Sequence, residues 1–122
     1  MTFLLIAAGA AVGALLRYAA STLLTTIDQG FPYNTLFVNL LGAALIGLCW
    51  GLWRDEAWFF AWGRAFLLIG LLGGFTTFSA LSLEVVQLLD AGRALTALTY
   101  VLSTIILGIL STLLAYLLVR QL

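Results

Sequence analysis

The stretch GGFTTFSALSLE, residues 73–84, combines two glycines, several hydroxyl side chains and a carboxylate within a chain that is otherwise apolar. A glycine inside a helix costs about 1 kcal/mol relative to alanine, so this pair predicts a helix interrupted at Gly73–Gly74. At membrane depth, non-helical backbone is tolerated only where it is buried in protein or lines an aqueous cavity. Its freed carbonyls can bind a cation, and the next half-helix N-terminus favours an anion. The alternative is a glycine kink that only aids packing.

Two further polar side chains lie inside apolar runs. Arg17 follows Gly9 and Gly13 at spacings of four, where small residues let helices approach closely. An arginine near hydrocarbon either reaches the headgroups or faces a cavity, where it would place positive charge at the mouth of an anion path. Asn39 lies about one turn inside the second apolar run. It either joins helices by hydrogen bonds or lines a water-filled path.

Polar residues also repeat every four positions along the last apolar run. The row consists of Tyr100, Thr104, Gly108 and Thr112. A single threonine can hide its hydroxyl on the carbonyl four residues back, but an aligned row favours the lining of a path. Glu84, near the far end of its run, is either a vestibule residue or a solvated carboxylate.

The composition predicts a membrane protein. Of 122 residues, 64% are hydrophobic and 8% charged, whereas a soluble domain carries about 25% charged residues. Five basic residues balance five acidic ones, which argues against a nucleic-acid partner. The chain has no histidine and a single cysteine, Cys49, so the usual zinc sites are excluded.

Four runs approach the roughly 20 residues that span a bilayer. They cover about Phe3 to Thr25, Leu36 to Trp53, Ala57 to Leu89, and Ala94 to Leu118. The first lacks the basic start of a signal peptide and is expected to span. The short linkers make successive helices antiparallel neighbours. We therefore predict an all-α membrane protein: one transmembrane domain, residues 1–122, with four helices and a broken third helix.

Arginine placement gives a weak orientation signal. One side of the predicted bundle carries Arg54, Arg64 and Arg120, and the other carries Arg93 with Arg17 nearby. Three against two is a poor positive-inside bias, so insertion in both orientations and an antiparallel dimer are plausible expectations.

Three motifs together resemble the Fluc, or CrcB, family of fluoride channels. GGFTTFSALSLE is similar to the family's third-helix signature, GGxTTFSTFSxE. GAAVGALLRY, residues 9–18, resembles its first helix, GxxxGxxxRY. NTLFVNLLGAALIG, residues 34–47, resembles its second helix, GTLxVNxxGxxxxG, with Asn in place of the first Gly. The third motif is highly specific, and the matches occur in the family's order.

The resemblance implies an antiparallel, dual-topology homodimer in the cytoplasmic membrane. Two narrow paths along the subunit interface would let fluoride leave the cell down its gradient. A structural sodium ion (Na+) at the dimer centre would be held by the main-chain carbonyls of Gly73 and Thr76. The implied partners are therefore fluoride, the lipid bilayer and a second subunit.

The resemblance also implies roles for individual side chains. Asn39 would donate a hydrogen bond to fluoride, and Phe78 would line the pore with its positive ring edge. Four residues correspond to polar positions of the family's path or vestibule: Ser79, Glu84, Tyr100 and Thr112. The polar row on the last apolar run adds Thr104 to the predicted path. Arg17 matches the basic vestibule residue.

Two departures from the family pattern affect the predicted pore. Where the family commonly has Thr-Phe, this chain has Ala80-Leu81, so Leu81 replaces a second pore phenylalanine. Either a homodimer conducts with altered rate or selectivity, or the chain is one subunit of a heterodimer whose paralogous partner supplies the ring.

Three other classes of function compete with a channel. A small multidrug-type proton-coupled exporter shares the size and span number, but it needs a buried carboxylate in its first helix, and no acidic residue precedes Asp28. A membrane scaffold would explain the polar row but not the interrupted stretch. An enzyme is not expected, because no nucleophile–base pair or metal set is visible.

Overall fold

The computed structural model describes residues 1–24 and 30–121, and the secondary structure of this part is helical. The elements are α1 (Thr2–Leu24), α2 (Tyr33–Trp53), η2 (Phe59–Leu72), α3 (Gly73–Phe75), α4 (Phe78–Asp90) and α5 (Ala94–Val119). Four stretches are long and apolar enough to cross a membrane: Thr2–Leu24, Tyr33–Trp53, Phe59–Asp90 and Ala94–Val119. The predicted four-span, all-helical chain is thereby confirmed. Asp28, predicted to lie in a loop, is outside the described residues.

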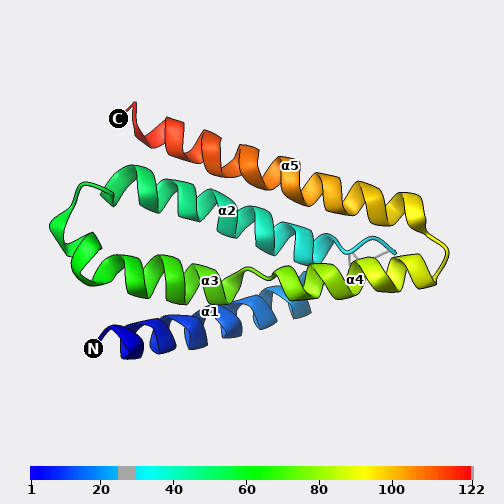
Figure 1. The fold of residues 1–122 in the computed structure, drawn as a ribbon, viewed down its shortest axis with the longest axis horizontal. Helices are drawn as coiled ribbons and strands as arrows, with labels where there is room; N and C mark the ends of the chain where they lie inside the picture. The colour runs from blue at the N-terminus through cyan, green and yellow to red at the C-terminus, as the bar shows by residue number, and fades with distance from the viewer. Residues whose placement is uncertain (25–29, 122) are drawn as a thin grey trace.

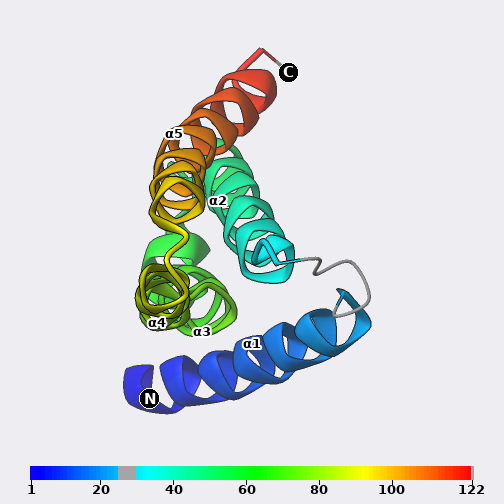
Figure 2. The same cartoon turned by 90° about the vertical axis from the view of Figure 1, so that its right-hand side faces the viewer.

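The helices form two closely packed groups (Figures 1 and 2). α2 packs along α5, while α1 packs across η2 and α3. α4 continues the line of α3 and contacts α5. η2 has π-helical rather than the expected α-helical hydrogen bonding. Both chain termini lie at the same end of the bundle, as an even number of spans requires (Figure 1).

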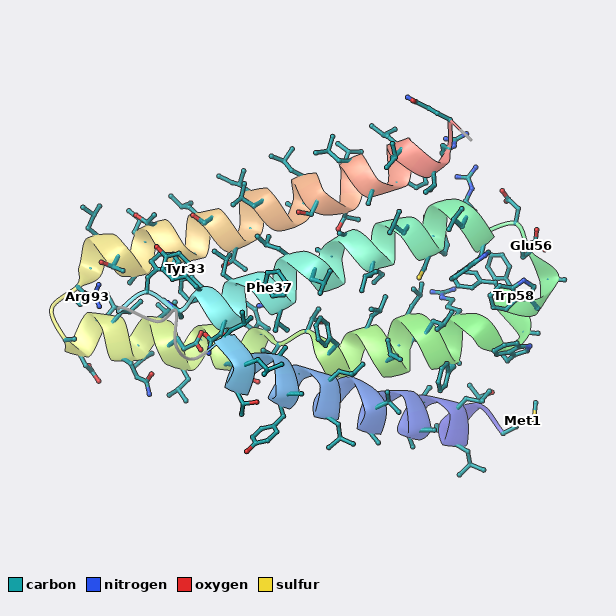
Figure 3. All side chains as sticks on the ribbon, turned by 180° about the vertical axis from the view of Figure 1, so that it is seen from behind. Met1, Tyr33, Phe37, Glu56, Trp58 and Arg93 are labelled. Atoms are coloured by element: carbon teal, nitrogen blue, oxygen red, sulfur yellow. The ribbon has the colours of Figure 1, made fainter. Side chains whose placement is uncertain are left out.

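The two ends of the bundle differ in side-chain chemistry. Arg93 lies at one end, and Glu56 and Trp58 lie at the other (Figure 3). At the second end, the Trp58 ring packs against the rings of Trp53 and Trp62 with centroids 5.4 and 5.2 Å away. Tryptophan is enriched at the headgroup level of bilayers, so this cluster marks one membrane interface.

Glycines bring α1 into backbone contact with η2 and α3. A Cβ atom added to Gly13 would lie 2.1 Å from the carbonyl oxygen of Leu71. A Cβ atom added to Gly74, on the facing segment, would lie 2.7 Å from the carbonyl oxygen of Ala10. Neither distance is compatible with a side chain. The small-residue pattern of the first helix therefore serves close packing, as its spacing predicts.

The helical path of the third span is interrupted at Thr76 and Thr77. The sequence-based location, Gly73–Gly74, is wrong: Gly73 is helical, with φ −64° and ψ −36°, and α3 continues to Phe75. Thr76 (φ −79°, ψ 158°) and Thr77 (φ −148°, ψ 124°) are extended. Gly74 instead allows the close approach of α1. The β-branched threonines favour extended backbone, and the Thr77 hydroxyl caps α4 by accepting the Ala80 N–H at 3.1 Å.

Gly13→Ala tests the backbone contact between α1 and η2. The added methyl group must displace the Leu71 carbonyl, and overpacking of this kind typically costs about 1–3 kcal/mol. We expect a lower Tm for the purified protein in detergent. Gly108→Ala is the matched control, because nothing lies within 4 Å of a Cβ there. Equal Tm values for the two variants would contradict the close approach.

Candidate functional site

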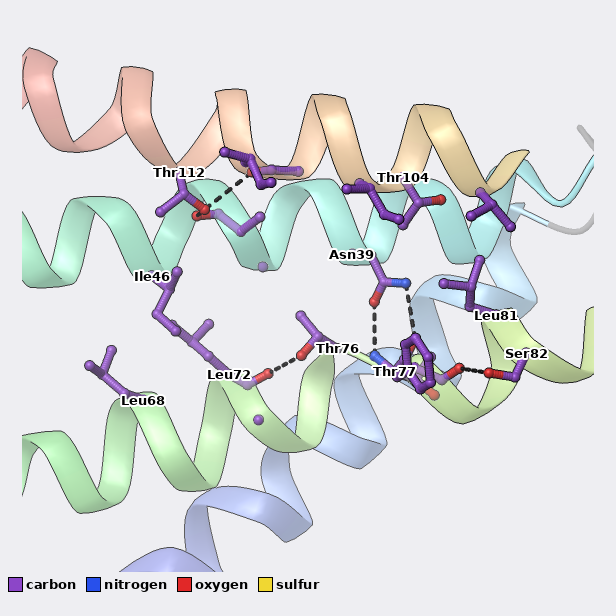
Figure 4. Close-up of a pocket in the computed structure, with 18 of the residues that line it drawn as sticks. Asn39, Ile46, Leu68, Leu72, Thr76, Thr77, Leu81, Ser82, Thr104 and Thr112 are labelled. Carbon is purple, nitrogen blue, oxygen red and sulfur yellow. Dashed lines mark hydrogen bonds between the residues drawn. The ribbon is translucent and has the colours of Figure 1, made fainter. Parts of the chain in front are cut away.

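Asn39 of α2 pairs with the interrupted backbone of the third span. Its Nδ2 donates to the Thr77 carbonyl oxygen at 3.0 Å, and its Oδ1 accepts the Thr77 N–H at 2.8 Å (Figure 4). One carboxamide thus satisfies both main-chain groups of an extended residue. Of the two roles that the sequence leaves open for Asn39, joining helices by hydrogen bonds is observed. The second amide hydrogen has no acceptor among the described residues, and Asn39 also lines a cavity.

The interruption frees a set of main-chain oxygens. In a continuous helix, the carbonyl of Gly73 would accept the N–H of Thr77, and the carbonyl of Thr76 would accept that of Ala80. Here the Thr77 N–H donates to Asn39 and the Ala80 N–H donates to the Thr77 hydroxyl. As a result, no described residue donates a hydrogen bond to the carbonyl oxygens of residues 73 and 76.

These freed oxygens are chemically suited to a hard monovalent cation. Unwound carbonyls at membrane depth are the donors that sodium sites in transporters use. The described part of the chain contains no cluster of three or more His, Cys, Asp or Glu residues that could hold a metal ion. The predicted donors Gly73 and Thr76 therefore fit a sodium ion by donor type.

A cavity of about 740 Å³ lies beside the interruption, between α2, α4, α5 and the η2–α3 segment (Figure 4). It brings together most residues predicted to form the path and the cation site: Asn39, Gly73, Thr76, Phe78, Leu81, Thr104 and Thr112. Its other walls are mainly aliphatic. The cavity is thus an apolar space with a few polar groups, the usual make-up of a binding site.

The threonine hydroxyls of this cavity already have acceptors. Thr104 donates to the Tyr100 carbonyl at 2.8 Å, four residues back on its own helix. The Thr112 hydroxyl oxygen lies 2.9 Å from the Ala43 carbonyl oxygen of α2 and 3.2 Å from the Gly108 carbonyl oxygen of its own helix. The polar row on α5 thus makes hydrogen bonds within and between helices. Its hydroxyl hydrogens would have to rotate to face an anion.

Four of the predicted path residues differ in exposure and partners. Phe78 is 79% exposed at the start of α4, whereas Leu81, one turn later, is 6% exposed and packs with Leu88, Ala97 and Tyr100. Tyr100 is fully buried. The Ser79 hydroxyl lies 3.2 Å from that of Thr77. Ser79 and Tyr100 do not line the 740 Å³ cavity.

A smaller cavity of about 370 Å³ contains the two predicted vestibule residues, Arg17 and Glu84. Both oxygens of the Glu84 carboxylate accept hydroxyl hydrogens, from Thr35 and from Tyr100, each at 2.6 Å. Sequence analysis missed Thr35, which is 6% exposed. Thr35 lies within the second-helix motif NTLFVNLLGAALIG, where it matches the Thr of the family pattern, but no role was assigned to it. Thr77 lines both this cavity and the larger one, so the interruption stands between them.

A third cavity, of about 630 Å³, adjoins the 740 Å³ cavity on the other side. The two share Ile46, Leu68, Ile109 and Thr112 as lining residues. Arg64 and Tyr116 border the third cavity. The three cavities therefore follow one another along the molecule, with an arginine on the first and on the last.

Family comparison agrees with the sequence motifs and with this architecture. The family described as CrcB-like protein, Camphor Resistance (CrcB), matches residues 4–116. The chain belongs to this CrcB family. The match spans all four membrane-crossing stretches, so the interruption and the cavities lie within the family's domain.

Curated relatives in the CrcB family carry the name "Fluoride-specific ion channel FluC". A protein of Thermus thermophilus is 45% identical over 115 residues, covering 93% of this chain and 91% of the relative. That of Granulibacter bethesdensis is 40% identical over 125 residues, covering 100% and 97%. That of Aquifex aeolicus is 43% identical over 114 residues, covering 93% and 92%.

Thr35→Val tests the hydrogen bonding around Glu84. The change preserves shape but removes one of the two hydroxyl donors to the carboxylate, and a hydrogen bond to a charged group contributes about 1.5–3 kcal/mol. We expect a clearly lowered Tm in detergent. Thr99→Val is the control, because the exposed Thr99 hydroxyl bonds only the Leu95 carbonyl of its own helix. Equal Tm values for Thr35→Val and Thr99→Val would show that the hydrogen bond from Thr35 to Glu84 does not stabilise the fold.

Proposed function

We propose that this protein is a fluoride-selective channel that lets fluoride leave the cell passively across the cytoplasmic membrane. The observation that carries the proposal is the family match together with relatives named fluoride-specific ion channels at up to 45% identity over most of the chain. The interrupted third span supports it, because irregular backbone at membrane depth is tolerated only within protein or beside a water-filled cavity.

The interruption suits the centre of a dimer of two oppositely inserted subunits. Gly73 and Thr76 line the 740 Å³ cavity, and their carbonyl oxygens lack donors among the described residues. In the proposed assembly these oxygens hold a structural sodium ion between the subunits. When bound, the ion supplies a fixed positive potential near the anion path without a mobile charged side chain.

The donors for fluoride come from the groups that line the successive cavities. Asn39 offers its second amide hydrogen to the 740 Å³ cavity, and the ring of Phe78 lies exposed beside it. The hydroxyls of Thr104 and Thr112 become donors to fluoride by rotating away from their present acceptors, the Tyr100 carbonyl for Thr104 and the Ala43 and Gly108 carbonyls for Thr112. Arg17 at one end and Arg64 at the other attract anions toward the path.

The alternative functions are less well supported by particular observations. α1 contains no Asp or Glu, so the carboxylate that a proton-coupled multidrug exporter requires in its first helix is missing. The heterodimer alternative rests on Leu81, where the family commonly has a phenylalanine. Because Leu81 packs in the apolar cluster with Tyr100, a homodimer would have one exposed pore ring per subunit, Phe78.

Ion efflux from liposomes that contain only this chain tests the proposal. We expect fluoride efflux into a fluoride-free buffer and no measurable chloride efflux, because the few donors suit a small, strongly hydrated anion. An ion-selective electrode follows each anion, and protein-free liposomes give the background. Equal permeation of both anions would reject selectivity. Efflux of neither anion would reject a functional homodimer.

A further inference from the structure

The Asn39 carboxamide occupies the position of a backbone partner. In a continuous helix the Thr77 N–H would donate to the Gly73 carbonyl. Instead it donates to Asn39 Oδ1 at 2.8 Å, and the Thr77 carbonyl accepts from Asn39 Nδ2 at 3.0 Å. A carboxamide carries a donor and an acceptor side by side, as the main chain of a neighbouring strand does. The pairing therefore stabilises the extended conformation of Thr77.

We infer that Asn39 is a positioning residue that holds the interruption open and keeps the Gly73 carbonyl free for a cation. The Thr77 N–H is the donor that helical geometry would return to that carbonyl, and Asn39 removes it from competition. The Thr77 hydroxyl acts in the same way one turn later, since it takes the Ala80 N–H that the Thr76 carbonyl would otherwise accept. The part of this inference that concerns sodium rests on the proposed function.

Close packing of α2 supports this role independently of the hydrogen bonds. Gly42 lies three residues after Asn39, on the same face of α2. A Cβ atom at Gly42 would lie 2.2 Å from Cγ2 of Thr76. The glycine therefore lets α2 approach the interruption closely enough for the short Asn39 side chain to reach the Thr77 backbone.

The geometry leaves Asn39 with two separate tasks. Its oxygen and one amide hydrogen are committed to Thr77, and the other amide hydrogen remains available to the cavity. Loss of Asn39 should thus affect both the anion path and the backbone that binds the cation. A residue that only donates to fluoride would affect the path alone, and this difference makes the inference testable.

The experiment compares Asn39→Leu with the wild-type protein in two measurements. The first is amide hydrogen exchange at Thr77, followed by NMR in detergent or nanodiscs. We expect exchange to accelerate about fivefold or more, which corresponds to roughly 1 kcal/mol for one lost hydrogen bond. The second is the Tm as a function of sodium concentration, with N-methylglucamine as the replacement ion. The sodium concentration for half-maximal stabilisation should rise by a similar factor.

Two further variants separate the role of Asn39 in holding the Thr77 backbone from its role in the anion path. Asn39→Asp keeps the acceptor for the Thr77 N–H, so slow exchange at Thr77 should persist while fluoride efflux falls. Thr104→Val alters the wall of the same cavity without touching the interruption, so both Thr77 exchange and the sodium response should match the wild type. Asn39→Ser, whose side chain is too short to reproduce both hydrogen bonds, replaces the leucine variant if that variant does not fold.

The outcomes distinguish this inference from the proposed function. Wild-type Thr77 exchange in Asn39→Leu, or in Asn39→Ser if the leucine variant does not fold, would overturn the positioning role of Asn39. Faster exchange with an unchanged sodium response would overturn the link to the cation. If the wild-type protein shows no sodium-dependent Tm, the proposed sodium site fails, while Thr77 exchange still decides the role of Asn39.

Discussion

In the hydrocarbon region of a bilayer, a backbone N–H or carbonyl that leaves a helix must find another partner, because water is not available. Thr77 meets this requirement through a single side chain, Asn39, which bonds both of its main-chain groups. The arrangement allows the third span to be extended at Thr76 and Thr77, while the carbonyls of Gly73 and Thr76 remain open to other ligands. Thr77 lines two of the three cavities, and the proposed cation site and anion path depend on that interruption.

Glycines set the distances that this pairing requires. Gly13 and Gly74 bring α1 against the segment before the interruption, and Gly42 brings α2 against the interruption itself. Further along α2, Gly47 approaches the backbone of Thr112, whose hydroxyl donates to the Ala43 carbonyl. Close backbone packing thus fixes helices on both sides of a segment that has no regular structure of its own. In lipid, this kind of packing replaces the hydrophobic effect as the force that joins helices.

Hydropathy and motif order were sufficient to predict the four spans, the helical class and the family. They were not sufficient to place the interruption, because glycine favours both a broken helix and a close approach to another helix, and Gly74 serves the second purpose. The polar row on α5 was ambiguous for a similar reason. Whether a threonine such as Thr104 faces a cavity or its own helix depends on its rotamer and its neighbours. The pairing of Thr35 with Glu84 joins residues 49 positions apart and left no periodic signal in the sequence.

Thr76 and Thr77 are expected to be extended in the membrane-embedded protein, as they are in the structure. Solid-state NMR of the protein in lipid bilayers measures this directly, through the 13Cα and 13Cβ chemical shifts of these two threonines. We expect shifts typical of extended backbone at both residues, with helical shifts at Gly73 and at Ser82. Helical shifts at Thr76 and Thr77 would mean a continuous third span, in which the carbonyls of Gly73 and Thr76 are not free.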